Sequence, residues 1–122
     1  MFDRREVLAG AAASALAGGG AAPMFGLHGK IVCAPGERDR FVAILTEGLD
    51  FLRTFPGCRI YVVAIDPSSA DDVWVTEVWD DEAAHAASLK TPEVQALIAR
   101  GRPLIVGGTR QVTRPLAGVG LG

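Results

Sequence analysis

Two apolar segments, separated by a short polar stretch, limit what this chain can fold into more than any other feature of its sequence. The first, Arg59–Asp66, contains an unbroken run of apolar residues, and the second covers Val73–Trp79. Both are rich in β-branched and aromatic side chains, which favour extended strands. The intervening residues 67–72 include proline, serine and aspartate, which are typical of a turn. We therefore predict two consecutive strands of one sheet.

The second of these strands is apolar on both faces. Side chains alternate between the two faces of a strand, so Val73, Val75 and Trp79 lie on one face and Trp74 and Val78 on the other. An antiparallel sheet with helices on one side ordinarily has a polar second face. We therefore expect a second copy of the chain to cover this face, in a homodimer packed sheet to sheet. The alternative is an exposed apolar surface that is prone to aggregation.

The chain has 122 residues, which is enough for one small domain. A TIM barrel or a complete dinucleotide-binding fold needs about twice that length, so both are excluded. The 12 basic and 14 acidic residues give a net charge of −2, which argues against nucleic acid as the main partner. The hydrophobic content of 49% and the charged content of 21% exclude a disordered chain.

Hydrophobic periodicity and turn residues define the remaining elements. We expect a strand over 24–34, a helix over 37–55, a short helix from Asp80 or Asp81 to about Lys90, a helix from Pro92 to Gly107-Gly108, and a last strand over 109–116. Thr91 is the expected cap of the later helix, with proline at its first position. The resulting order, β-α-β-β-α-α-β, is the split β-α-β pattern of the ferredoxin-like plan, an α+β fold.

The N-terminal residues 1–22 resemble an export signal. Arg4-Arg5, with Leu8 three positions on, resembles a twin-arginine motif, and the uncharged run Ala9–Gly29 follows. That run is mostly alanine and glycine, so it is too weakly apolar for a stable membrane anchor. We expect cleavage near Ala21 or Ala22 and export in the folded state, to the periplasm or outside the cell. The alternative is an alanine-rich helix that belongs to the fold.

The two cysteines are expected to stay free. In the split pattern the first two strands run parallel with another strand between them, so Cys33 and Cys58 fall at opposite ends of the sheet. That separation exceeds the ~7 Å Cα distance that a disulfide allows. The sequence contains no Cys-x-x-Cys motif and no Cys/His cluster, so we predict no metal site.

Four segments resemble the antibiotic biosynthesis monooxygenase family, in particular its quinol monooxygenase branch. They are Gly29-Lys30-Ile31-Val32 followed by Pro35-Gly36, Phe55-Pro56-Gly57-Cys58, Trp74-Val75-Thr76-Glu77-Val78-Trp79, and Glu82-Ala83-Ala84-His85-Ala86-Ala87-Ser88-Leu89. The most specific part is Glu-Val-Trp with a histidine six residues after the tryptophan. The resemblance covers about residues 25–116. It predicts a family domain over 24–116 and a flexible tail over 117–122.

The resemblance implies a dimeric α+β barrel that oxidises quinols or related phenolic, polyketide-like aromatics with O₂ and needs no flavin, haem or metal cofactor. Its partners would be a small aromatic substrate, O₂ and a second copy of the chain. A phenol becomes a good one-electron donor to O₂ once it is deprotonated. The protein therefore needs an apolar pocket, an aromatic wall, and a base that shares the proton and stabilises the anion.

Four residues are candidates for this site. His85 is the expected proton acceptor, because its ordinary pKa lies near neutral pH. Trp79 ends a strand just before the helix of His85 and is the expected ring wall. Ser88, one helical turn from His85, is expected to hydrogen-bond it or a substrate oxygen. His28 stands roughly where haem-degrading relatives place a polar pocket residue and is a second candidate substrate contact.

Structural interpretations stay open for these side chains. Trp79 also fits a core aromatic, and His85 also fits a surface pair with Asp81 four residues earlier. In polyketide-oxidising relatives a tyrosine commonly stands at the position of His85, which alters the proton route. We expect Tyr61 and Trp74 to serve core or dimer packing. We expect three arginines to be solvated, with contact of one of them to an anionic substrate as the alternative (Arg100, Arg102 and Arg110).

Two other functions compete with a monooxygenase. A non-catalytic dimeric barrel that binds small aromatics would share the same fold, since fold alone does not choose between these activities. Haem degradation is the other alternative. Relatives in that branch carry an iron-ligating histidine at a position that falls near Leu97 here, so this chain departs from their pattern.

Overall fold

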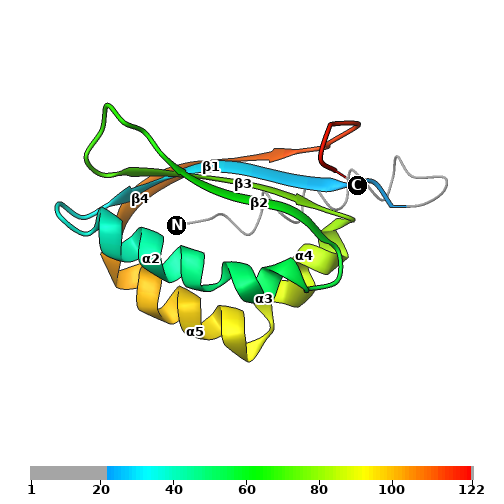
Figure 1. Cartoon of the computed structure of the whole chain (residues 1–122), viewed down its shortest axis with the longest axis horizontal. Helices are drawn as coiled ribbons and strands as arrows, with labels where there is room; N and C mark the ends of the chain where they lie inside the picture. The colour runs from blue at the N-terminus through cyan, green and yellow to red at the C-terminus, as the bar shows by residue number, and fades with distance from the viewer. Residues whose placement is uncertain (1–21, 122) are drawn as a thin grey trace.

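The computed structural model describes residues 22–121, which form a four-stranded antiparallel sheet with its helices packed on one face (Figure 1). The elements in chain order are β1 (Phe25–Cys33), α2 (Arg38–Glu47), α3 (Leu49–Arg53), β2 (Cys58–Ile65), β3 (Asp72–Trp79), α4 (Glu82–Leu89), α5 (Pro92–Gly101), a single 3₁₀ turn (Arg102–Leu104) and β4 (Ile105–Thr113). The strand order β2-β3-β1-β4 confirms the α+β, ferredoxin-like plan. The predicted signal peptide lies, up to residue 21, outside the described residues.

The sheet register decides which side chains share a face. Leu27 of β1 is paired with Glu77 of β3 on one side and with Val112 of β4 on the other. On the side of β3 away from β1, Glu77 is paired with Tyr61 of β2. These four residues form one row across the sheet, on the face toward the helices, and Glu77 lies in the middle of this otherwise apolar or aromatic row.

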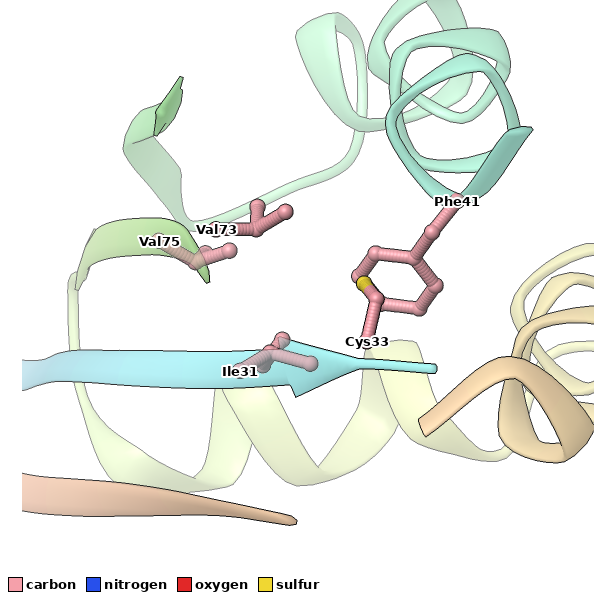
Figure 2. Close-up of a cluster of buried hydrophobic side chains, with 5 residues drawn as sticks. All are labelled: Ile31, Cys33, Phe41, Val73 and Val75. Atoms are coloured by element: carbon pink, nitrogen blue, oxygen red, sulfur yellow. The ribbon is translucent and has the colours of Figure 1, made fainter. Parts of the chain in front are cut away.

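The inner face of the sheet carries two hydrophobic clusters. Figure 2 shows the first, in which Ile31 and Cys33 of β1 and Val73 and Val75 of β3 gather on the face that Phe41 of α2 points toward. The second cluster lies at the other end of the sheet, where it includes the candidate residue Trp79 (Phe25, Leu27, Leu52 and Trp79). Burial of these side chains supplies the main driving force for packing the helices on the sheet.

Two of the predicted helix boundaries differ from the structure. The expected helix over 37–55 is divided at Gly48 into α2 and α3. A Cβ atom at Gly48 would stand 2.6 Å from Leu97 Cδ1 of α5, so glycine permits the close approach of that helix. The expected helix from Pro92 to Gly107 instead ends at Gly101.

The prediction of a helix up to Gly107-Gly108 is therefore wrong for the residues after Gly101. Pro103 cannot continue an α-helix, because it lacks an N–H and its ring clashes with the preceding turn. β4 begins at Ile105, so Gly107 and Gly108 lie inside a strand, which ends at Thr113 rather than Leu116. A Cβ atom at Gly108 would stand 2.5 Å from the carbonyl oxygen of Lys30, so glycine suits this close contact between strands.

Both cysteines are free, as predicted. Cys58 begins β2 and is paired with Trp79, whose other neighbour is Phe25 at the start of β1. Cys33 ends β1 and therefore lies at the opposite end of the sheet. The topology separates the two thiols.

The outer face of the sheet, opposite the helices, combines apolar and aromatic side chains. Ring centroids of Trp74 and His28 lie 5.2 Å apart in a stacked arrangement, and Val62 of β2 is 49% exposed. His28 Nδ1 lies 2.9 Å from Thr76 Oγ1. We call this surface the outer face below (His28, Ile60, Val62, Trp74, Thr76 and Val78).

Candidate active site

The end of β3 and the start of α4 bring Trp79 and His85 together. Asp81 caps α4 by accepting a 2.8 Å hydrogen bond from the backbone N–H of Ala84, which turns the chain sharply after the strand. His85 then faces the sheet, with its ring centroid 5.5 Å from that of Trp79 in an edge-to-face arrangement. The ring centroid of Phe25 lies 5.2 Å from that of His85. Trp79 is 1% exposed and His85 5% exposed.

Glu77 adds a carboxyl group to this pair of rings. Its side chain is 15% exposed, and its Oε1 accepts a 3.0 Å hydrogen bond from Trp79 Nε1–H. The same oxygen lies 3.8 Å from His85 Nε2. One carboxyl oxygen therefore faces both the indole and the imidazole. We call Glu77, Trp79 and His85 the buried triad.

Burial sets the protonation of this triad. Loss of solvation raises the pKa of Glu77 to about 7, although the Trp79 hydrogen bond and the charge of Arg110 act in the opposite direction. Loss of solvation, with a smaller effect of Arg110, lowers the pKa of His85 to about 4. The imidazole is therefore neutral at pH 7, and its contact with Glu77 is not an ion pair of two full charges.

Arg110 lies closer to the triad than expected. It is paired with Gly29 on β4, two residues before Val112 of the inner face, so strand alternation places it on the same side as the core. Its Nε and Nη2 atoms are buried. Its positive charge acts to lower the pKa of Glu77 and Glu82, against the larger effect of burial, and adds to the lowering of the pKa of His85. The expectation that Arg110 is solvated is wrong, because period-two alternation turns it inward.

The hydrogen bonds of the other two candidate residues are made to groups other than the imidazole of His85. The Ser88 hydroxyl is buried and donates a 2.7 Å hydrogen bond to the backbone carbonyl of His85, one turn earlier in α4. His28 lies on the outer face, because its neighbour Leu27 points into the core. The sheet therefore separates His28 from the triad. Substrate-binding roles for His28 and Ser88 stay predictions.

Sequence reasoning assigned no role to Glu77, although a signal for it exists. In β3 the alternation that directs Val73, Val75 and Trp79 inward also directs Glu77 inward. A carboxylate on a buried stripe needs hydrogen-bond or charge partners, so this position pointed to a polar site. The alternative surface pair of His85 with Asp81 is not the arrangement found, since Asp81 caps the helix and His85 faces the sheet.

The side chains of residues 22–121 include no group of three or more His, Cys, Asp or Glu that could hold a metal ion. Within the same range, no helix has the length and apolar composition that crossing a bilayer requires. Leu97, the position that matches the iron ligand of haem-degrading relatives, lies in α5 beside Gly48.

Comparison with known proteins identifies the family. The profile of the antibiotic biosynthesis monooxygenase family matches residues 24–100, and the chain belongs to this family. Among curated proteins, none matches this chain. A crystal structure of a "putative antibiotic biosynthesis monooxygenase" from Chloroflexus aurantiacus is 49% identical, with a TM-score of 0.75 over 81% of this chain and 99% of that one.

More distant crystal structures share the fold. PA3566 from Pseudomonas aeruginosa is 21% identical, with a TM-score of 0.72 over 81% of this chain and 100% of that one. A conserved protein from Bacteroides thetaiotaomicron, described as a possible oxidoreductase, is 16% identical, with a TM-score of 0.69 over 75% of this chain and 97% of that one.

Proposed function

We propose that this protein oxidises quinols or related phenols with O₂, without an organic cofactor or a metal, at the buried triad. Membership of the antibiotic biosynthesis monooxygenase family supports an oxygenase. The observation that carries the proposal is the neutral, buried imidazole of His85. It lies edge-on to Trp79 and 3.8 Å from the carboxyl group of Glu77.

The chemistry requires only groups that this site holds or that the substrate brings. A hydroquinone and O₂ yield a hydroxyquinone and one water molecule, so the substrate supplies all the electrons and no external reductant is needed. Deprotonation of the phenol makes it a one-electron donor, and the resulting radical pair recombines to form the new C–O bond. A base that takes the phenol proton lowers the barrier to the first step.

Two residues of the triad, His85 and Trp79, have distinct parts in this scheme. His85 accepts the phenol proton, since an imidazole that is neutral at pH 7 has a lone pair for it. Trp79 offers an aromatic edge and a rigid wall for a flat ring. The apolar surroundings, including Phe25, exclude water and so strengthen the electrostatic effect of nearby charges on the phenolate.

We also propose that a second copy of the chain covers the outer face. The helices occupy the other side of the sheet (Figure 1), while Val62 and the stacked pair of Trp74 and His28 face away from them. Sheet-to-sheet packing would remove this apolar surface from water. In such a dimer, His28 would contact the partner rather than the triad of its own chain.

Export by the twin-arginine route is a further part of the proposal, and it rests on Arg4-Arg5 and the uncharged run that follows. Cell fractionation of the full chain tests it. We expect the wild-type protein outside the cytoplasm and the Arg4→Lys, Arg5→Lys double variant retained inside. Equal distribution of both proteins would contradict export by this route.

Isotopically labelled O₂ tests the reaction itself. One labelled oxygen atom should enter the hydroxyquinone product and the other should appear in water. A product that carries no label would contradict a monooxygenase. Saturable binding of phenols without any oxygen consumption would instead favour a non-catalytic aromatic-binding protein, and haem binding with release of iron would favour the haem-degrading alternative.

A further inference from the structure

The phenol proton needs a final acceptor after it reaches His85. We propose, resting on that scheme, that Glu77 is the terminal proton acceptor of the site and receives the substrate's proton from His85 through its Oε1. The contacts that point to this are the 3.8 Å separation of His85 Nε2 and Glu77 Oε1 and the 3.0 Å hydrogen bond that Trp79 donates to the same oxygen.

The proton relay is balanced without a further reactant. The phenol O–H bond breaks as an Nδ1–H bond forms on His85, and the Nε2–H bond breaks as an Oε1–H bond forms on Glu77. The imidazole begins and ends neutral, and the negative charge of the carboxylate is exchanged for that of the phenolate. Proton transfer through Nε2 requires the 3.8 Å contact to shorten to about 3 Å. Contacts of this kind are often long without substrate and tighten in the complex.

Trp79 holds the acceptor oxygen in position. Glu77 and Trp79 lie two residues apart on β3, so both side chains point to the same face. The indole N–H donates to Oε1 and so fixes the carboxyl group beside the imidazole of His85. Trp79 is therefore a positioning residue for Glu77 as well as a wall for the substrate ring.

Besides His85, the charged and titratable groups around Glu77 lie on β4, α4 and β2, while its neighbour on β1 is the apolar Leu27. Arg110 of β4 contributes a positive charge, and the pKa of Glu82 on α4 is raised, mainly by burial. Burial also raises the pKa of Tyr61 and of Cys58 on β2, and the charge of Glu77 acts in the same direction. Tyr61 and Cys58 therefore stay protonated at neutral pH.

These surroundings favour the direction of the relay. The pKa of Glu77 is about 7 and that of His85 about 4, so a proton that arrives on the imidazole moves downhill to the carboxylate. An acceptor whose pKa lies near the working pH is also the most effective base. His85 alone would be too weak a base to retain the proton.

Nitrogen NMR of the imidazole rings tests the relay without any turnover. The chain has two histidines. The His28→Asn variant loses the signal of His28, so the signal that remains belongs to His85. We expect the ring-nitrogen shifts of His85 to change as the pH passes about 7, when Glu77 ionises. This step should vanish in Glu77→Gln and persist in Glu82→Gln, a matched carboxyl variant on α4. A step that persists in Glu77→Gln, or its absence from the wild type, would overturn the proposal.

Kinetics provide the second readout. In the wild type, kcat/KM for oxygen uptake should rise with pH through about 7. Glu77→Gln should lower kcat by about 10²-fold and abolish this rise, whereas Glu77→Asp should restore it in part. Thermal unfolding shows whether each variant is folded. If Glu77→Gln does not fold, the kinetics of Glu77→Asp still test the role of Glu77.

The two proposals fail in different ways. If the wild type consumes no oxygen with any quinol or phenol, the proposed function fails, and the NMR titration still decides whether Glu77 and His85 are coupled. If the wild type is active and Glu77→Gln has an unchanged pH profile, the monooxygenase stands and the role of Glu77 is overturned.

Discussion

The indole N–H of Trp79 donates a 3.0 Å hydrogen bond to the carboxyl group of Glu77, two residues earlier on the same strand. This contact joins the most buried aromatic residue of the site to a carboxyl group whose pKa is raised by burial. It also orients the carboxyl oxygen that faces His85. The strand thus presents a positioned carboxyl group, and the helix that follows it presents the imidazole.

Trp79→Phe removes the donor and keeps an aromatic ring. Because the hydrogen bond lowers the pKa of Glu77, its loss should raise that pKa and shift the rising limb of the kcat/KM profile above pH 7. The lost hydrogen bond should also cost about 1 kcal/mol of stability. Phe55→Leu, which alters an edge contact of Trp79 and keeps the indole N–H, is the control. An unshifted limb in Trp79→Phe would show that the hydrogen bond does not tune Glu77.

The pH dependence of stability should separate Glu77 from His85. In the His85→Asn variant, the unfolded chain loses the Glu77 proton near its ordinary pKa of 4.5, while the folded chain keeps it to about 7. The unfolded state then binds fewer protons, so the free energy of unfolding should fall by about 3 kcal/mol as pH rises between these values. Urea unfolding across this range measures the effect.

In the Glu77→Gln variant, the free energy of unfolding should change with pH in the opposite direction. The folded chain then keeps His85 neutral down to about pH 4, whereas the unfolded chain is protonated below 6.5. The unfolded state binds more protons, so stability should rise as pH increases from 4 to 6.5. In the wild type the two effects largely cancel from 4.5 to 6.5, because the pair holds one proton in both states. Equal slopes in the two variants would contradict these pKa directions.

Gly57 sets the distance between the start of β2 and α4. Its φ of +89° disfavours any side chain, and a Cβ atom would stand 2.5 Å from Ala84 Cβ. Gly57→Ala should therefore destabilise the fold by at least about 2 kcal/mol. Gly36→Ala is the matched control, since φ is +81° there and nothing lies within 4 Å, so only about 1 kcal/mol is expected. Equal losses would show that the contact with Ala84 is unimportant.

Val62→Lys tests the dimer. Val62 is 49% exposed on the outer face, and a charge there would be buried at a sheet-to-sheet interface. We expect light scattering to show a dimer for the wild type and at least a tenfold weaker dimer for the variant. Leu89→Lys, at a 39% exposed leucine of α4, should leave the dimer intact. A monomeric wild type, or equal effects of both variants, would contradict this interface.

Much of the fold could be predicted because local signals and topology agree. The cap at Thr91 with proline after it sets the start of α5, and the apolar strands set β2 and β3. The end of α5 was missed because Leu104 and Ile105 continue an apolar pattern that a helix and a strand can share. Pro103, which ends the helix, was the stronger signal.

The site was predictable only in part, for a physical reason. Trp79 and His85 meet because a strand end and a capped helix are adjacent in the chain, and their spacing alone indicates this. The environment of Glu77 depends on Arg110, which comes from a distant strand of the sheet. Alternation places both residues on the inner face, but their mutual influence arises only when β3, β1 and β4 assemble.

Oxygen uptake by the purified, metal-stripped protein lacking residues 1–22, compared with its His85→Ala variant, tests the central claim most directly. A panel of hydroquinones and phenols should reveal uptake that saturates with substrate, above the subtracted autoxidation rate. His85→Ala should lower kcat by about 10²-fold or more while the protein stays folded. No uptake across the panel, or unchanged turnover in His85→Ala, would contradict a monooxygenase that works through this imidazole.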